Sequence, residues 1–405
     1  MFKISKIDIA QIKEKMIYCM TLITLYYYSY RYPLQYNSVS TSPTYGDTPF
    51  GFQIAKYIFM IFIIIIVLII NGNYIRIKNK TIFLLCVCLC FQQILIGIVY
   101  QLQIQFAFLL IPIILYLVNK TFVNIDTIDK IFRCFWLYSV VYESFMVLNY
   151  YIYDRLPALG YSGGIISSVR FGGPWDDPNG FSLLLTFYLV YGFFNFMGMK
   201  KFIFIASTVS MLIMTWSLTG WISCLLSILI LCIIRYKDKN LSAKIRNTVI
   251  IMTVFIAIII FFNYDTIESI IEIMLENKQG SIEQHMDSFT LADIQILTLF
   301  GIKPMLIFVE SGVVALMIRG GIIALVIFYI IGISSIYNIN SMINKKNNNK
   351  VLYSIITYQI AFLITMINLP LIYSFANMAL YSIFTIIAYS KQKNSIFNKG
   401  ELING

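Results

Sequence analysis

The chain has 405 residues, of which 59% are hydrophobic and 12% are charged, with a mean hydropathy of +0.79 and a net charge of +11 at pH 7. An ordinary soluble domain is roughly 45–50% apolar and about 25% charged. The composition therefore excludes a soluble globular protein and predicts an all-α polytopic membrane protein, with a single integral membrane domain over residues 1–405. A nucleotide-driven pump is not expected, because the sequence lacks the phosphate-binding pattern G-x-x-x-x-G-K-[ST].

Apolar segments, each near the roughly 20 residues that cross a hydrocarbon core of about 30 Å as a helix, mark the predicted membrane spans. We count twelve, and in chain order they are 16–30, 54–70, 82–100, 104–118, 132–152, 180–197, 202–217, 219–234, 248–263, 310–333, 351–369 and 371–389. Short interruptions at 101–103, at 217–220 and at Pro370 each divide a longer apolar stretch into two spans.

The basic residues indicate an orientation. If the N-terminus is cytoplasmic, 23 of the 30 Lys and Arg residues fall on the cytoplasmic side, which is the bias of membrane proteins. We therefore expect both termini in the cytoplasm and long outer loops at 31–53, 153–179 and 264–309. Basic loops that lie against anionic lipid account for the net charge, so a nucleic-acid partner is not expected.

The seven cysteines lie in or beside predicted spans, where a thiol behaves as a small hydrophobe. Cys86, Cys88 and Cys90 are two residues apart, so on a helix their side chains point away from one another. They also lack the spacing of a zinc site. We expect neither a metal site nor a disulfide.

The second outer loop contains an unusually polar stretch, RFGGPWDDPNG, at residues 170–180. Part of it predicts a helix start. Pro178 favours an extended backbone at Asp177, and Asn179 is suited to N-cap a helix that begins near Gly180.

Arg170 is a candidate for anion binding. A guanidinium near a helix N-terminus suits phosphate, because its fork matches the phosphate oxygens and the helix dipole adds to the attraction. The alternative interpretation is a solvated loop arginine that pairs with Asp176 or Asp177.

The third outer loop predicts two amphipathic helices. Residues 265–280 place Ile, Met and Leu at three- and four-residue spacing with Glu on the other face. Ser281 to Gln284 then match a capping box that opens a second helix. The pair could form a lid over the membrane surface or pack on the bundle for stability alone. His285, in the first turn of the second helix, is a candidate proton acceptor or phosphate contact, or an ordinary surface histidine.

The next span begins at Glu310 and contains Arg319 nine residues later, about 13 Å along a helix at 1.5 Å per residue. A charge well inside the bilayer is costly and usually faces a cavity or a partner. We therefore expect a functional role for Arg319, with a buried ion pair to Glu143 as the alternative.

Together, residues 165–335 resemble the O-antigen polymerase and O-antigen ligase superfamily, of the Wzy and WaaL type. The resemblance depends on RFGGPWDDPNGF before a helix, on WSLTGWISCLLSILIL, and on a long outer loop followed by ESGVVALMIRGG. Its most specific element is R-F-x-G-x-x-x-D-P-N, from Arg170 to Asn179.

This resemblance implies a glycosyltransferase of the bacterial plasma membrane, without metal or cofactor, that acts on undecaprenyl-diphosphate-linked oligosaccharide at the outer face. A polymerase would extend O-antigen or capsule chains, whereas a ligase would transfer the glycan to the lipid A core of lipopolysaccharide. Ligases typically carry a histidine close to where this chain has Glu310, so the sequence favours a polymerase. Membrane lipid, a chain-length regulator and a flippase are the implied partners.

The resemblance also implies residue roles. Arg170 would hold the leaving diphosphate, with Arg319 as a second cation, and His285 or Glu310 would take the proton of the acceptor hydroxyl. Further substrate contacts are expected at Trp175, Asp176, Asp177 and Asn179. A competing class is a flippase for lipid-linked oligosaccharides, but transporters commonly contain repeats and interrupted helices that this sequence does not display.

Overall fold

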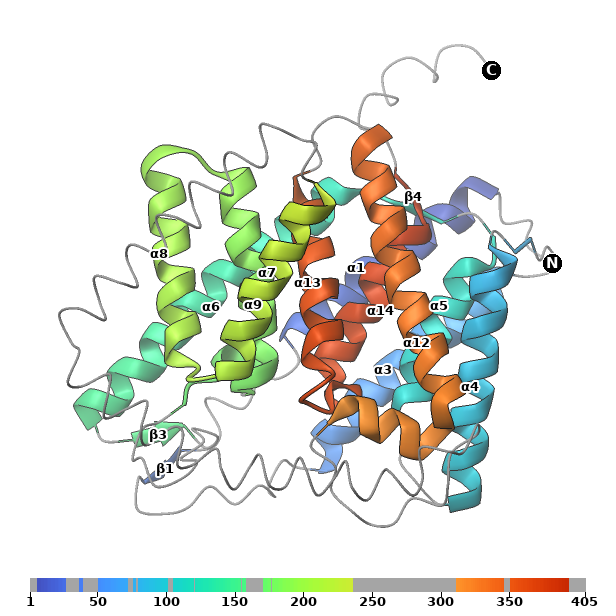
Figure 1. The fold of residues 1–405 in the computed structure, drawn as a ribbon, viewed down its shortest axis with the longest axis horizontal. Helices are drawn as coiled ribbons and strands as arrows, with labels where there is room; N and C mark the ends of the chain where they lie inside the picture. Colours follow the sequence, from blue (N-terminus) through green and yellow to red (C-terminus); the bar gives the residue numbers. More distant parts are fainter. Residues whose placement is uncertain are drawn as a thin grey trace.

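The computed structural model describes residues 6–26, 36–38, 50–71, 76–77, 79–100, 105–119, 121–153, 155–157, 170–175, 177–235, 311–345 and 350–392 (Figure 1). Some of the predicted features lie outside the described residues: the interruption at 101–103, the span 248–263, the outer loop 264–309, Asp176, His285 and Glu310.

Eleven α-helices make up most of the described chain. They are α1 (Lys6–Tyr26), α3 (Phe50–Asn71), α4 (Lys80–Tyr100), α5 (Gln105–Leu117), α6 (Ile125–Tyr153), α7 (Pro178–Asn195), α8 (Gly198–Met214), α9 (Leu218–Ile234), α12 (Gly312–Lys345), α13 (Val351–Thr365) and α14 (Phe375–Tyr389). Two 3-10 helices, η2 (Gly173–Trp175) and η3 (Leu371–Tyr373), lie shortly before α7 and α14.

Every predicted span within the described residues overlaps one of these helices. The interruptions predicted at 217–220 and at Pro370 fall where α8 gives way to α9 and where α13 gives way to α14. Among the described residues, three helices are long and apolar enough to cross a membrane, namely Lys80–Val99, Ile125–Ile152 and Gly312–Ile343. The described chain is therefore all-α and has membrane-spanning character, whereas the twelve spans and the side of each terminus stay predictions.

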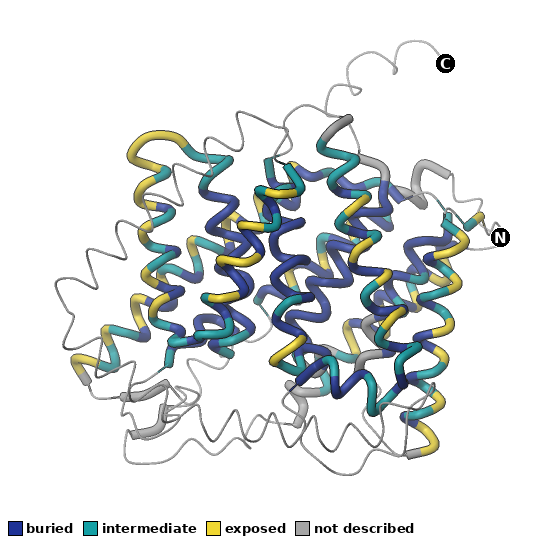
Figure 2. The backbone as a smooth tube through the Cα atoms, viewed as in Figure 1, coloured by how far each residue is buried: buried dark blue, intermediate teal, exposed yellow. Residues whose placement is uncertain are grey.

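Burial divides the helices into a central and a peripheral group (Figure 2). Helices α7, α13 and α14 are buried along most of their length. The peripheral helices α3, α4, α6 and α8 expose large apolar side chains, among them Ile69, Phe91, Leu137 and Phe202. Apolar side chains on the outside of a helix bundle are expected where the surroundings are hydrocarbon instead of water.

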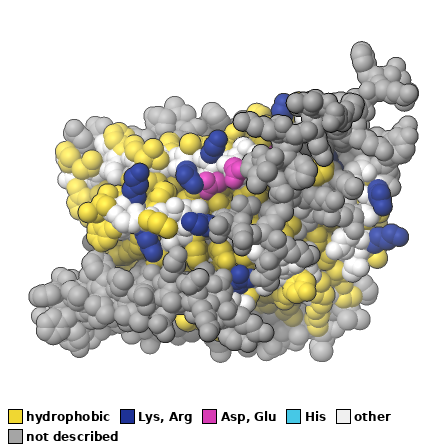
Figure 3. Space-filling model, turned by 90° about the horizontal axis from the view of Figure 1, so that it is seen from above, with side chains coloured by type: hydrophobic (Ala, Val, Ile, Leu, Met, Phe, Trp, Pro, Cys, Tyr) yellow, Lys and Arg dark blue, Asp and Glu magenta, His cyan; other side chains and the backbone are white. Residues whose placement is uncertain are grey.

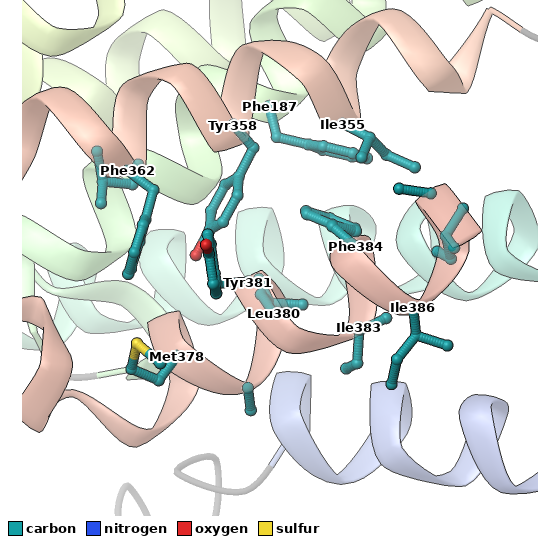
Figure 4. Close-up of a cluster of buried hydrophobic side chains, with 14 of the residues drawn as sticks. Phe187, Ile355, Tyr358, Phe362, Met378, Leu380, Tyr381, Ile383, Phe384 and Ile386 are labelled. Carbon is teal, nitrogen blue, oxygen red and sulfur yellow. The ribbon is translucent and has the colours of Figure 1, made fainter. Parts of the chain in front are cut away.

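Aromatic rings from the central helices α7, α13 and α14 pack together (Figure 4). Phe362 and Tyr381 stack with ring centroids 4.9 Å apart, and Phe187 and Phe384 stack at 5.8 Å. Aromatic pairs add about 0.5–1.5 kcal/mol each beyond the burial of their area. This cluster therefore fixes α7 and α14 relative to each other, and with them the ends at which these two helices begin.

Short strand pairs tie the loops together. β1 (Tyr36–Ser38) pairs antiparallel with β3 (Arg155–Pro157), so that the first two predicted outer loops lie at the same end of the bundle. At the opposite end, β2 (Phe122–Val123) pairs in parallel with β4 (Lys391–Gln392) (Figure 1).

The end of the bundle that carries β2 and β4 is rich in basic side chains (Figure 3). Near the start of α6, Arg133 forms an ion pair with Asp129 at 2.6 Å and lies 5.9 Å from the centre of the Tyr191 ring. A basic end of this kind is what the positive-inside rule expects of the cytoplasmic side.

Candidate functional site

Three helices, α7, α9 and α14, begin close together at the end of the bundle that carries β1 and β3 (Figure 1). Their N-cap residues are Asp177, Ser217 and Ser374. Ser217 Oγ donates to Asn179 Oδ1 at 2.7 Å, and the side-chain amide of Asn377 lies against the Cα of Gly180. The positive ends of three helix dipoles therefore meet here, which favours a negative charge at this end.

Asp177, and not Asn179, caps α7. The backbone of Asp177 is extended (φ −130°, ψ 100°), and its carboxylate accepts the N–H of Asn179 at 3.1 Å. The helix begins at Pro178, because proline has no N–H to satisfy at the first helical position and its fixed φ is already helical. The prediction that Asn179 caps a helix beginning near Gly180 was therefore wrong by two residues. The side chain of Asn179 is therefore available for a different contact.

That contact is with Arg170. The guanidinium Nη2 of Arg170 donates to Asn179 Oδ1 at 2.8 Å, and its Nε donates to the carbonyl of Thr215 at 3.0 Å. The backbone is held as well, because the N–H of Phe171 donates to the carbonyl of Met214 at 3.1 Å. Arg170 is thus a partly buried side chain fixed between the start of α7 and the turn from α8 to α9, and not a solvated loop arginine.

Gly180 lets two polar groups approach each other. A Cβ at this position would collide with Asp177 Oδ2 and with Asn377 Nδ2, so both groups lie against the Cα of Gly180. Asn377 is itself held, since it accepts from the hydroxyl of Tyr358 at 3.0 Å and donates to Ser374 Oγ at 2.9 Å. The starts of α7 and α14 are therefore joined by the packed polar side chains of Asp177 and Asn377.

Burial raises the pKa of Asp177 above its ordinary value. The amides of Gly180 and Asn179 and the charge of Arg170 oppose this rise, because each of them stabilises the carboxylate. A carboxyl group so close to Arg170 reduces the positive potential of the site when ionised and leaves it intact when protonated.

Trp175 lies in the packed core. Its side chain is 2% exposed, its indole N–H donates to the carbonyl of Leu25 at 3.1 Å, and its ring packs edge-on against Phe181. In this arrangement Trp175 anchors η2 to α1. Asn179, another predicted substrate contact, accepts a hydrogen bond from Arg170 directly.

Arg319 lies just before a break in α12. Gly321 has a left-handed backbone (φ 70°, ψ −174°), so residues 312–320 form a short helix that turns away from the long one (Figure 1). The rise of about 13 Å from Glu310 to Arg319 was taken as a depth in the bilayer, but the short helix that carries Arg319 runs at an angle to the long part of α12, so this rise does not measure depth along the bundle. The carbonyl of Gly320, beside the break, accepts a hydrogen bond from the side-chain amide of Gln92 in α4 at 2.6 Å.

The alternative for Arg319, an ion pair with Glu143, is wrong. Glu143 is 2% exposed in α6, and neither of its carboxyl oxygens has a hydrogen-bond partner among the described residues. It lies against the backbone amide of Gly173, in the segment that follows Arg170. Glu143 therefore belongs to the surroundings of Arg170.

Three contributors to the site were missed: the Thr215 carbonyl, Ser217 and Asn377. Ser217 had a signal, because a serine two residues before the predicted start of the span 219–234 is a typical N-cap residue. The other two had none, since their contacts reach across the fold. Within the described ranges, no group of three or more His, Cys, Asp or Glu side chains is arranged to hold a metal ion.

No protein-family model matches the chain, and no curated protein matches it. The functional interpretation therefore depends on the geometry around Arg170 and on the resemblance of its sequence motif.

Proposed function

We propose that the protein is a polymerase of surface-polysaccharide repeat units in the bacterial plasma membrane. It would transfer a growing glycan from undecaprenyl diphosphate to a hydroxyl group of a new lipid-linked repeat unit. The reaction takes place at the outer face, on the side of β1, β3 and Arg170. Neither a metal ion nor a cofactor takes part.

One observation carries the proposal: Arg170 is held in a set orientation where three helices begin. A diphosphate is a dianion or trianion, and it needs fixed donors and positive potential as it leaves. An arginine supplies a planar fork of donors, and the helix N-termini add partial positive charge. The apolar periphery suits the polyprenyl chain of such a substrate, which lies in lipid.

The proposed transfer breaks one bond and forms another. The bond between the anomeric carbon and the diphosphate oxygen breaks, and its electron pair leaves with the diphosphate. The acceptor oxygen bonds to the same carbon, and its proton goes to a base within hydrogen-bond reach. His285 and Glu310 stay the candidates for this base, and Arg319 is proposed as a second cation.

The test is complementation of a strain that lacks its own polysaccharide polymerase. The native protein should restore a ladder of long glycans, whereas Arg170→Ala should leave single repeat units. Arg170→Lys should fail almost as completely, because an ammonium group keeps the charge but not the planar fork. Arg155→Ala is the matched control, since Arg155 lies in β3 at the same end of the bundle.

Other outcomes identify other functions. Unchanged chain length in Arg170→Ala would remove the role given to Arg170. Single repeat units with the native protein, together with restored transfer of glycan to lipid A core in a strain that lacks its own ligase, would identify a ligase. Loss of lipid-linked repeat units at the outer face would identify a flippase.

A further inference from the structure

Glu143 is a buried carboxyl group whose two oxygens lack hydrogen-bond partners among the described residues. A buried polar group without a partner costs roughly 1–3 kcal/mol, and more when charged. Ionisable side chains within membrane helices are rare and are usually retained for a function. Packing alone therefore does not account for a glutamate at this position of α6.

The segment 170–175 packs against α6, and other elements hold it by hydrogen bonds. In the segment 170–175, Phe171 packs against Tyr142 and Met146, which flank Glu143 in α6. The N–H of Phe171 and the indole of Trp175 both donate to backbone carbonyls. The backbone amide of Gly173 lies against Glu143 without completing a hydrogen bond.

Gly173 cannot be replaced by a residue with a side chain. Its backbone is left-handed (φ 55°), and a Cβ would collide with the ring of Phe181. A small movement of this residue towards α6 would complete the bond to Glu143. The same movement would shift Arg170, three residues earlier in the segment.

We propose that Glu143 is a positioning residue for Arg170: one of its carboxyl oxygens accepts the N–H of Gly173 and so holds the segment 170–175 against α6 while Arg170 engages a diphosphate. The proposal rests on the proposed function, because it assigns Glu143 to the same anion site. Glu143 acts through the backbone and does not touch the substrate.

Two substitutions separate positioning from packing. Glu143→Leu removes the acceptor but fills the space, so a purely structural role predicts equal or greater stability and unchanged anion binding. Positioning predicts about tenfold weaker binding of inorganic pyrophosphate to the purified full-length protein, at unchanged or higher thermal stability. Glu143→Gln keeps an acceptor oxygen and should retain affinity within about twofold. Ser139→Ala, one turn earlier in α6, is the control, because Ser139 bonds only within its own helix.

Hydrogen exchange of residues 171–175 provides a readout that needs no ligand. The amides of this segment should exchange faster in Glu143→Leu than in the native protein, and at the native rate in Glu143→Gln. Two results would overturn the role of Glu143. One is unchanged hydrogen exchange in Glu143→Leu, and the other is a pyrophosphate affinity that Arg170→Ala lowers but Glu143→Leu does not. Pyrophosphate binding that Arg170→Ala leaves unaltered would instead contradict the proposed function, and the exchange rates would still decide whether Glu143 holds Gly173.

Discussion

Arg170 Nη2 donates to Asn179 Oδ1 at 2.8 Å, across the start of α7. The same oxygen accepts from Ser217 Oγ at 2.7 Å, so one amide oxygen joins the segment before α7 to the start of α9. An arginine held in this way has already lost its rotamer freedom, and binding an anion costs it less entropy. The pair therefore links the packing of the helices to the proposed chemistry.

Substitution of Asn179 should separate the positioning of Arg170 from its charge. Asn179→Ala removes the acceptor for both donors and should lower the free energy of unfolding by about 1–3 kcal/mol. Asn179→Asp keeps an acceptor and strengthens the bond, but its negative charge competes with a phosphate. We expect near-native thermal stability with at least tenfold weaker pyrophosphate binding for Asn179→Asp. Calorimetric titration and thermal unfolding of both variants measure these effects.

Ser217→Ala is the control for Asn179. It removes the other donor to the same oxygen and the N-cap of α9, which costs about 1 kcal/mol, but it leaves Arg170 and Asn179 in contact. If Asn179→Asp bound pyrophosphate as tightly as the native protein, the guanidinium would not be the anion-binding group.

Gly180→Ala should destabilise the protein, although alanine is normally preferred to glycine inside a helix by about 1 kcal/mol. The added Cβ would press on Asp177 and Asn377 at once. Overpacking of this kind typically costs about 1–3 kcal/mol, so a net loss of stability is expected in thermal unfolding. Asn377→Ala opens space and should recover part of the loss in the double variant. Gly180→Ala with native or higher stability would mean that the two side chains are not packed over Gly180.

The positions of the helices could be predicted because membrane helices are long and apolar, and their interruptions contain polar residues, glycine or proline. Thus Pro370 and the residues 217–220 marked real helix boundaries. The helix cap was predicted less well. Pro178 was taken to set the backbone before it, but its stronger effect is to occupy the first helical position itself.

Local sequence patterns could not predict the break in α12 or the partners of Arg170. Gly320 and Gly321 are adjacent glycines in an apolar run, which membrane helices tolerate without breaking, so the pair did not reveal a left-handed residue at Gly321. The partner carbonyl of Arg170 belongs to Thr215, 45 residues away, and a backbone carbonyl carries no residue-specific signal. Contacts of this kind depend on the way in which helices meet.

A buried lysine, Lys13, lies at the end of the bundle opposite to Arg170. Lys13 of α1 is fully buried, three residues before the predicted span 16–30, and its ammonium group donates to the carbonyl of Val118 at 2.6 Å and to that of Leu115 at 3.3 Å. Burial lowers the pKa of Lys13 from 10.5 to about 7. The folded protein therefore releases this proton at a lower pH than the unfolded chain does.

Lys13 should make stability depend on pH. Between about pH 7 and the ordinary lysine pKa of 10.5, the unfolded chain binds a proton that the folded chain has released, so the free energy of unfolding rises with pH in this window. One proton gives a slope of at most about 1.4 kcal/mol per pH unit. Lys13→Met should abolish this rise and be more stable than the native protein near pH 6, where the native protein buries the charge. Lys15→Met, an exposed site two residues away, should keep the native slope. Thermal unfolding from pH 6 to pH 10 measures all three proteins, and equal slopes in the native protein and Lys13→Met would contradict the assignment to Lys13.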